Sequence, residues 1–428
     1  MDGNSTVRLG ILGCGNVGRA LVELVGENGD AIAARTGLRL EVARVIVRDV
    51  AKYASIDLPA GVLGDDAAAL VADPGIDLVV EVIGGVDPAR RLILTALEAG
   101  KPVVTANKEL VAASGAELFD AAAKAGVDLL YEAAVAGAVP LMRPLRESLA
   151  GDRLQRVIGI VNGTTNFILT RMAEGGQSFA DALAEAQGLG YAESDPTADV
   201  EGFDAAAKAA IIASVAFGVQ VDAADVYREG ITAITADDVA MAARLGYVVK
   251  LVAVAEKSGD AVAIRVHPAM VPKDHPLAAV REAFNAVFVE GAAAGELMFY
   301  GRGAGGRPTA SAVLGDVIDA AANLRQGTSA GVVGLARAHI RPIDELQSQY
   351  YLVLDVVDVP GVLEKVAGAF ARHGVSIEQV VQLGLGDEAR LVLVTHTAFE
   401  RDVQATLAVL RDLDEVDRVG TLLRVVGA

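Results

Sequence analysis

The sequence contains a single cysteine and no tryptophan among its 428 residues. With only Cys14 available, no intramolecular disulfide bond can form. The five histidines are scattered, and no paired cysteine or histidine spacing occurs, so the sequence lacks the ligand pattern of a zinc site. These absences argue against a disulfide-stabilised scaffold and against a zinc-dependent enzyme.

Positive charge is also scarce, because 37 lysines and arginines stand against 56 acids and give a net charge of -19. Such a surface repels phosphate backbones and anionic lipids, so we expect no nucleic-acid partner and no membrane partner. The first eight residues lack the apolar core of a signal peptide. No apolar run approaches the roughly 20 residues that span a bilayer. We therefore expect a cytoplasmic protein.

The hydrophobic content of 53% is ample for large cores, and the length predicts two or three domains. Strands alternate with helices over residues 1–135, which is typical of a parallel, doubly wound α/β sheet. Residues 136–310 mix strands with long alanine-rich helices and predict an α+β domain for substrate binding and dimerisation. A helix within 311–340 is expected to return to the first domain. Residues 350–428 show the βαββαβ order of a ferredoxin-like unit.

The segment Gly13-Cys14-Gly15-Asn16-Val17-Gly18 matches the pattern G-x-G-x-x-G between a predicted strand, Val7–Leu12, and a predicted helix. Gly13 permits a tight turn, Gly15 admits a pyrophosphate, and Gly18 lets the helix approach the strand. The helix N-terminus presents free N–H groups and a partial positive charge. An ordinary glycine-rich turn is the alternative, but this position favours an N-terminal Rossmann domain that binds a dinucleotide.

The end of the second predicted strand, Leu40–Val47, bears on the choice of cofactor. An acid there would hold the ribose 2′-hydroxyl of NAD and repel the 2′-phosphate of NADP. The chain places Arg48 and Lys52 at this end, with Asp49 between them. Two cations favour NADP, although NAD stays possible, and the alternative is that both charges are merely solvated.

Several segments, in this order, resemble those of homoserine dehydrogenases, and the resemblance covers nearly the whole chain. They are residues 10–18, Thr105-Ala106-Asn107-Lys108, Asn162-Gly163-Thr164-Thr165-Asn166, residues 188–196, residues 199–208 and residues 296–305. The C-terminal unit, with Asp358-Val359-Pro360-Gly361-Val362-Leu363 after its first strand, resembles an ACT domain.

The resemblance implies an NADP-dependent enzyme that interconverts L-homoserine and L-aspartate 4-semialdehyde in threonine, methionine and isoleucine biosynthesis. It implies that Lys208 is the acid/base, that Lys108 supports it, and that Glu193 and Asp204 bind the amino group and hydroxyl region of the substrate. This chemistry is reasonable, because hydride transfer to a carbonyl leaves an alkoxide that a positioned ammonium can stabilise and protonate. When the same lysine must accept a proton, oxidation is expected to favour alkaline conditions.

The resemblance assigns three further groups of residues. The remaining substrate-binding residues are Asp199 and Thr164. Cofactor contacts are assigned to Gly13, Gly15, Asn16, Val17, Gly18, Thr105, Lys108, Gly190 and Gly303, beside Arg48 and Lys52. A structural sodium ion is assigned to Glu132 and to the carbonyl groups of Val135, Gly137 and Val139.

Each assignment has a plainer alternative. Asp204 and Lys208 lie four residues apart on a predicted helix, so they share a face, and such pairs are often ordinary surface ion pairs. Lys108 follows a predicted strand end, where a lysine is often a solvated loop residue. The carboxylate of Glu132 can equally well cap a helix or loop, since sequence shows no coordination geometry.

The ACT-like tail suggests regulation. Such units pair with one another and bind amino acids, and threonine is the usual effector in the family, so we expect threonine to bind near Asp358–Leu363. The alternative is a tail that only supports oligomerisation, because likeness of fold does not establish a ligand. The expected assembly is a homodimer or a homotetramer.

Three other functions fit less well. Aspartate-semialdehyde dehydrogenase needs a cysteine nucleophile, and Cys14 lies at the pyrophosphate end of the glycine loop. A fused aspartate kinase has no room in this chain. A non-catalytic amino-acid sensor that keeps NADP as a structural ligand would not need the acid/base set of Lys108, Glu193, Asp204 and Lys208.

Overall fold

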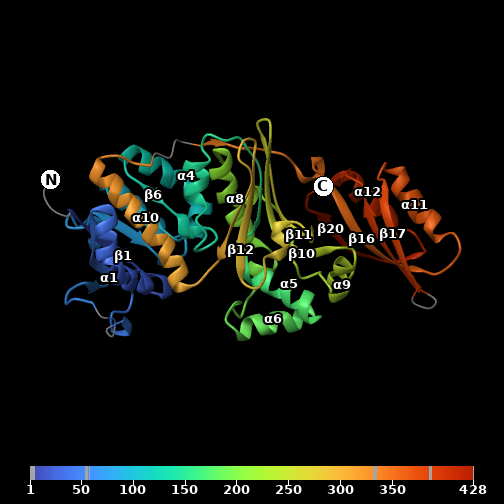
Figure 1. The fold of residues 1–428 in the computed structure, drawn as a ribbon, viewed down its shortest axis with the longest axis horizontal. Helices are drawn as coiled ribbons and strands as arrows, with labels where there is room; N and C mark the ends of the chain where they lie inside the picture. Colours follow the sequence, from blue (N-terminus) through green and yellow to red (C-terminus); the bar gives the residue numbers. More distant parts are fainter. Residues whose placement is uncertain (1–4, 54–55, 57, 331–334, 385–387, 428) are drawn as a thin grey trace. The chain divides into compact units, whose positions relative to one another are not determined.

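The computed structural model describes residues 5–53, 56, 58–330, 335–384 and 388–427. Of the predicted helix within 311–340, residues 331–334 lie outside this described part. The chain forms two compact units, shown as a ribbon in Figure 1. Unit 1 comprises Met1–Val157, Ala207–Asp225 and Asn285–Ala338, and unit 2 comprises Ile158–Ala206, Val226–Phe284 and His339–Ala428. The predicted domain limits at residues 135 and 310 remain predictions. No helix in the described part is long and apolar enough to cross a membrane.

Unit 1 contains a parallel sheet of six strands in the order β3-β2-β1-β4-β5-β6. The strands are β1 (Ser5–Leu12), β2 (Leu38–Ile46), β3 (Leu63–Gly64), β4 (Leu78–Glu81), β5 (Val103–Thr105) and β6 (Leu129–Leu130). Strand order reverses between β1 and β4, and this switch point is where doubly wound sheets bind ligands. The predicted Rossmann fold is therefore confirmed.

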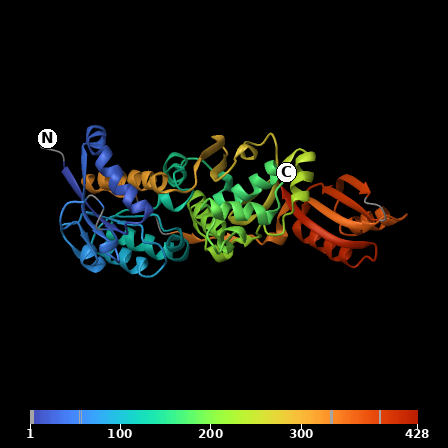
Figure 2. The same cartoon turned by 90° about the horizontal axis from the view of Figure 1, so that it is seen from below.

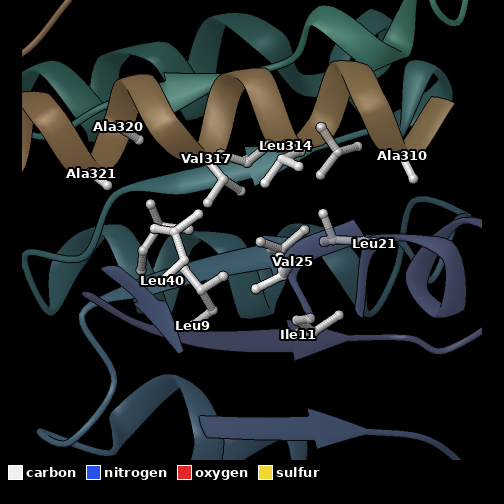
Figure 3. Packing of buried hydrophobic residues seen from close by; sticks show 14 of the residues in the cluster. Leu9, Ile11, Leu21, Val25, Leu40, Ala310, Leu314, Val317, Ala320 and Ala321 are labelled. Carbon is white, nitrogen blue, oxygen red and sulfur yellow. The ribbon is translucent and has the colours of Figure 1, made fainter. Parts of the chain in front are cut away.

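Helices α1 and α10 pack together over this sheet, as Figure 3 shows. The helices of this region are α1 (Asn16–Thr36), α2 (Ala67–Ala72), α3 (Ala89–Glu98), α4 (Lys108–Ala125) and α10 (Gly306–Gln326). Leu21 and Val25 of α1 lie in one buried cluster with Leu314 and Val317 of α10. Ala310, which is also fully buried, lets the helix backbones approach closely because its side chain is small. A helix distant in sequence thus completes the N-terminal core.

A second sheet includes three strands that lie wholly or partly in unit 1. Strands β7 (Leu154–Ile160), β12 (Phe284–Gly291) and β13 (Gly295–Arg302) follow one another in the sheet order β13-β12-β7. Helix α8 (Phe203–Phe217) begins in unit 2 and ends in unit 1, so it carries residues of both units along one axis.

Unit 2 is built around a long antiparallel hairpin. Its strands are β10 (Tyr247–Ser258) and β11 (Ala261–Pro272), which pair along their whole lengths. The helices of this part are α5 (Gly163–Gly175), α6 (Phe179–Gly188), α7 (Thr197–Val200) and α9 (Ala236–Arg244). The hairpin residues are apolar on both faces and mostly buried, which indicates that the sheet is covered on both sides.

The C-terminal part of unit 2 has the predicted βαββαβ order. Its elements are β16 (Gln347–Val357), α11 (Val362–Arg372), β17 (Ile377–Gly384), β18 (Glu388–Thr395), α12 (Glu400–Arg411) and β20 (Val416–Val425). The strand order β20-β16-β18-β17 is that of a ferredoxin-like sheet, with both helices on one face (Figure 2). Strand β20 also pairs with β11, through Ala269 with Arg424 and Met270 with Val425. The ACT-like fold is confirmed, and its sheet continues into the hairpin.

Candidate active site

The glycine loop joins β1 to α1 and has the shape that a pyrophosphate requires. Gly13 has a φ of +101°, and its N–H donates to the carbonyl of Ile46 over 2.9 Å. A Cβ atom on Gly18 would lie 2.2 Å from the carbonyl oxygen of Gly13, so a larger residue cannot fit. A Cβ atom on Gly15 would meet no atom within 4 Å. Gly15 is also the N-cap of α1 and offers no side-chain cap, so the helix N-terminus suits an anion.

The loop after β2 holds the residues predicted to choose the cofactor. The carboxylate of Asp49 accepts the N–H groups of Ala51 and Lys52 at 3.1 and 3.3 Å, so it stabilises the turn. Arg48 and Lys52 are exposed, and within the described part of the chain neither has a carboxylate at ion-pair distance. This loop therefore presents two cations and an acid that is already engaged by the backbone.

A cavity of about 280 Å³ in unit 1 brings three predicted site residues together. Lys108, Lys208 and Gly303 all line it, although they are far apart in the sequence. Gly84 and Gly85, which follow β4, form another part of its wall. Two ammonium groups that face one cavity at the carboxyl end of a parallel sheet suit an electron-rich oxygen.

The position of Lys108 is set by its neighbour Asn107. Lys108 is the first residue of α4, and Asn107 is the N-cap, whose side-chain oxygen accepts the N–H of Leu110 over 3.1 Å. The amide nitrogen of Asn107 donates to the carbonyl of Gly85 over 2.6 Å. The start of α4 is thus tied to the loop after β4, and Lys108 is not the solvated loop lysine of the alternative interpretation.

Thr105 and Glu81 form the layer beneath Asn107. Both side chains are fully buried, and the hydroxyl of Thr105 donates to the carboxylate of Glu81 over 2.6 Å. The same hydroxyl accepts the N–H of Asn107 over 3.0 Å. The other carboxylate oxygen of Glu81 accepts the N–H groups of Ile83 and Gly84. This buried chain of bonds joins the ends of β4 and β5, and Glu81 was not among the predicted site residues.

In unit 2, Asn162 brings two of the predicted substrate acids together. Its amide nitrogen donates to Asp199 over 2.6 Å and to Asp204 over 2.9 Å. Its side-chain oxygen accepts the N–H of Thr165 over 2.8 Å, so Asn162 also caps α5. Two carboxylates held side by side are suited to bind an ammonium group. Asn162 opens a motif quoted above, but its spacing gave no sign of this double role.

Thr164, in the first turn of α5, contacts the loop that follows α6, and this loop contains Glu193. The hydroxyl of Thr164 donates to the carbonyl of Tyr191 over 2.7 Å, and the Tyr191 ring lies 4.9 Å from that of Phe167. Gly190 has a φ of +77°, which lets the loop turn back toward α5. The side chain of Glu193 is exposed. Thr164 therefore positions this loop through its hydroxyl.

Helix α8 carries both Asp204 and Lys208. Asp204 is 7% exposed and lies one turn before Lys208 on the same face of the helix. A buried aspartate held by an amide is not the exposed partner of an ordinary surface ion pair. Along α8, Asp204 thus belongs to unit 2 and Lys208 to unit 1.

The carboxylate of Glu132 makes the contacts of a cap. It accepts the N–H groups of Leu141, Met142 and Arg143 ahead of the π-helical segment Pro144–Ser148. No group of three or more histidine, cysteine or acidic residues that could hold a metal occurs in the described part. These contacts match the capping alternative, and the sodium ion at Glu132 stays a prediction.

Comparison with known proteins agrees with this geometry. The family described as homoserine dehydrogenase matches residues 140–318, its NAD binding domain matches residues 13–132, and the ACT domain matches residues 350–415. A homoserine dehydrogenase of Corynebacterium glutamicum is 50% identical over 426 residues, which are 98% of this chain and 96% of that protein.

Solved structures resemble the chain over its length. A homoserine dehydrogenase from Thiobacillus denitrificans is 40% identical, with a TM-score of 0.94 and coverage of 99% of each chain. A hyperthermophilic archaeal homoserine dehydrogenase in complex with NADPH is 31% identical, with a TM-score of 0.64, and covers 74% of this chain and 98% of its own.

Proposed function

Because this chain belongs to the homoserine dehydrogenase family and is an NAD(P)-dependent oxidoreductase, we propose that Lys208 and Lys108 carry out its proton chemistry. The observation that supports this role is that both lysines line the same cavity. We place the substrate amino group at Glu193, Asp199 and Asp204, because Asn162 holds two of these carboxylates together.

The residues of the chain divide the reaction between them. The nicotinamide of the cofactor, when bound, accepts or donates the hydride. Lys208 takes the hydroxyl proton of homoserine as the carbonyl forms, and it returns a proton to the alkoxide in the reverse direction. Lys108 stabilises the negative charge that develops on that oxygen. Gly303 lines the same cavity and cannot carry a larger side chain, since a Cβ atom there would lie 2.2 Å from the side chain of Asn285.

The test is turnover of homoserine, followed by the absorbance of the reduced nicotinamide. We expect Lys208→Ala to lower kcat by about 10²–10⁴, the usual contribution of a positioned acid/base. Lys124→Ala is the control. Lys124 is an exposed lysine in the last turn of α4, at the opposite end of that helix from Lys108. Cofactor binding by Lys208→Ala would show that the variant is folded. A variant that turns over at the parent rate would refute the role of Lys208.

We propose NADP as the preferred cofactor, because Arg48 and Lys52 follow β2 and Asp49 is engaged by the backbone. The archaeal relative described in complex with NADPH is compatible with this choice. Arg48→Ala with Lys52→Ala should raise the KM for NADP by about tenfold or more, with a much smaller change for NAD. Equal changes for both cofactors would contradict the proposal.

We also propose that a structural sodium ion binds at Glu132 and at the carbonyl groups of Val135, Gly137 and Val139. Oε2 of Glu132 accepts one N–H, so an ion would have to share this oxygen with the cap. The test compares melting temperatures in sodium and potassium chloride at equal ionic strength, for the parent and for Glu132→Gln. A melting temperature that does not depend on the cation would remove the ion and leave Glu132 as a cap.

We propose that threonine binds at the loop between β16 and α11 and lowers activity. Val359 and Leu363 are 50% and 46% exposed there, and Gly361, the N-cap of α11, provides no side-chain cap. Asp358→Ala should raise the threonine concentration needed for inhibition by about tenfold. An unchanged threonine response would contradict this site.

Removal of the C-terminal residues 350–428 is a poor test of threonine binding, because it would also remove β20, which pairs with β11. Paired tails would give a homodimer or homotetramer, which light scattering distinguishes.

A further inference from the structure

The C-terminal sheet has two faces with different surroundings. Tyr350, Leu352 and Leu354 of β16 face α11 and α12 and belong to one buried core. Successive residues of a strand point to opposite faces, so Tyr351 and Val353 face the other way. There they line one cavity with residues of α9, the helix that precedes the long hairpin in unit 2.

A cavity of about 250 Å³ lies between α9 and this second face. Its apolar wall contains Met241 of α9, Val353 of β16 and Val392 of β18. Its polar wall contains Tyr351 and Arg244, among others. It shares no lining residue with the cavity of Lys208, so it is an additional site.

Most charges around this cavity are already matched. Arg390 bridges Asp237 of α9 over 3.0 Å and Asp355 of β16 over 2.7 Å. Arg418 pairs with the second oxygen of Asp355 over 2.8 Å. These ion pairs connect α9 to the sheet and hold the cavity open between them.

Two lining groups are unmatched. Tyr351 is fully buried, and its hydroxyl has no hydrogen-bond partner in the part of the chain that the structure describes. A buried polar group without a partner is uncommon in proteins and calls for an explanation. Burial raises the pKa of Tyr351, so the hydroxyl stays protonated and can donate. Arg244, on the last turn of α9, is exposed to solvent, and its side chain makes no ion pair or hydrogen bond within the residues that the structure describes.

We propose that this cavity binds a small aliphatic carboxylate. Arg244 and the Tyr351 hydroxyl hold the carboxylate, and Met241, Val353 and Val392 contact the aliphatic body. Both unmatched groups are hydrogen-bond donors, and a carboxylate is the acceptor that an arginine recognises best. An ammonium group on the ligand would have Asp237 within the same lining. The proposal is separate from the proposed function, since it concerns binding and not turnover.

The experiment measures binding to the full chain by calorimetry, with isovalerate and L-valine as probes at millimolar concentration. We expect binding of at least one probe, weakened by about tenfold or more in Arg244→Ala and in Tyr351→Phe. Arg411→Ala is the control, because Arg411 is exposed at the end of α12, on the opposite face of the sheet. If Asp237→Asn lost the binding of L-valine but kept the binding of isovalerate, the ligand would be identified as an amino acid.

A second pair of variants separates ligand binding from folding. Tyr351→Phe removes a hydroxyl without a partner, so the melting temperature without ligand should not fall. Tyr350→Phe removes a hydroxyl that donates to Glu400 over 2.9 Å, so it should lower the melting temperature and leave probe binding intact. The proposal is wrong if neither probe binds the parent chain, or if binding survives both Arg244→Ala and Tyr351→Phe.

Discussion

The side-chain amide of Asn162 donates a hydrogen bond of 2.9 Å to the carboxylate of Asp204. The same amide nitrogen reaches Asp199, so one neutral side chain holds two acids that would otherwise repel each other. Asn162 itself contacts no proposed reacting atom. It therefore acts on the substrate through the acids that it positions.

Replacement of Asn162 by aspartate tests this relationship. Asn162→Asp keeps the oxygen that caps α5 but removes the donor, so the two acids lose their shared partner. We expect the KM for homoserine to rise by about tenfold or more, since a hydrogen bond to a charged group contributes about 1.5–3 kcal/mol. The KM for the cofactor should not change. Steady-state kinetics with each substrate varied in turn would expose a general folding defect, which would alter both constants.

Thr105 should matter through its hydroxyl alone. Thr105→Val keeps the shape of the side chain but leaves the buried carboxylate of Glu81 without this donor. We expect the free energy of unfolding to fall by about 1–3 kcal/mol and kcat to fall as the start of α4 shifts. Thr105→Ser keeps the hydroxyl and serves as the control. Urea unfolding that is equal for the two variants would show that the bond to Glu81 adds nothing.

Lys250 should make stability depend on pH in the alkaline range. It is 2% exposed and donates to Asn166, and burial lowers its pKa from 10.5 to about 8. Between these values the unfolded chain binds more protons than the folded one, so stability rises with pH. The rise should be roughly 1–3 kcal/mol, and Lys250→Met should abolish it. Urea unfolding across this range, with Lys124→Met as control, measures the slope, and an equal slope in Lys250→Met would contradict the assignment.

The titration of Asp316 should have the opposite effect on stability to that of Lys250, and it should do so at acid pH. It accepts the N–H of Glu132 over 2.8 Å, and burial raises its pKa from 3.8 to about 7. Between these values the folded chain binds more protons, so this residue makes stability fall as pH rises. Asp316→Asn keeps an acceptor without the charge, so its stability relative to the parent should increase from pH 4 to pH 7. A constant difference across this interval would show that Asp316 titrates normally.

The sequence predicted most strands of the Rossmann and ACT-like parts because each is a short apolar run bounded by turn residues. The length of α1 could not be predicted from apolar spacing, because the helix extends to Thr36 although its second half, around Glu27 and Asp30, is largely exposed. Helix α4 was not predicted, and a solvated loop lysine therefore stood as the alternative interpretation of Lys108. The capping residue Asn107 is a helix-start signal that would have corrected this.

The sequence predicted the separate segments of the site but not how the fold brings them together. Lys108 and Lys208 were chosen from motifs, and the fold brings them to one cavity. The links of Glu81 to Thr105 and of Asn162 to Asp199 and Asp204 could not be predicted, because they join segments that are distant in sequence. The unpaired hydroxyl of Tyr351 depends in the same way on which face of β16 meets α9.

Because β11 pairs with β20, part of the β11 edge has no strand partner during synthesis until β20 has been translated. A ribosome releases β11 while β20 has yet to be translated, so for that interval β11 exposes backbone groups at its edge that could pair with a neighbouring nascent chain. Strand β20 ends this exposure, and its Arg424, which is 2% exposed, forms a buried ion pair with Glu400 and a second ion pair with the partly exposed Glu229.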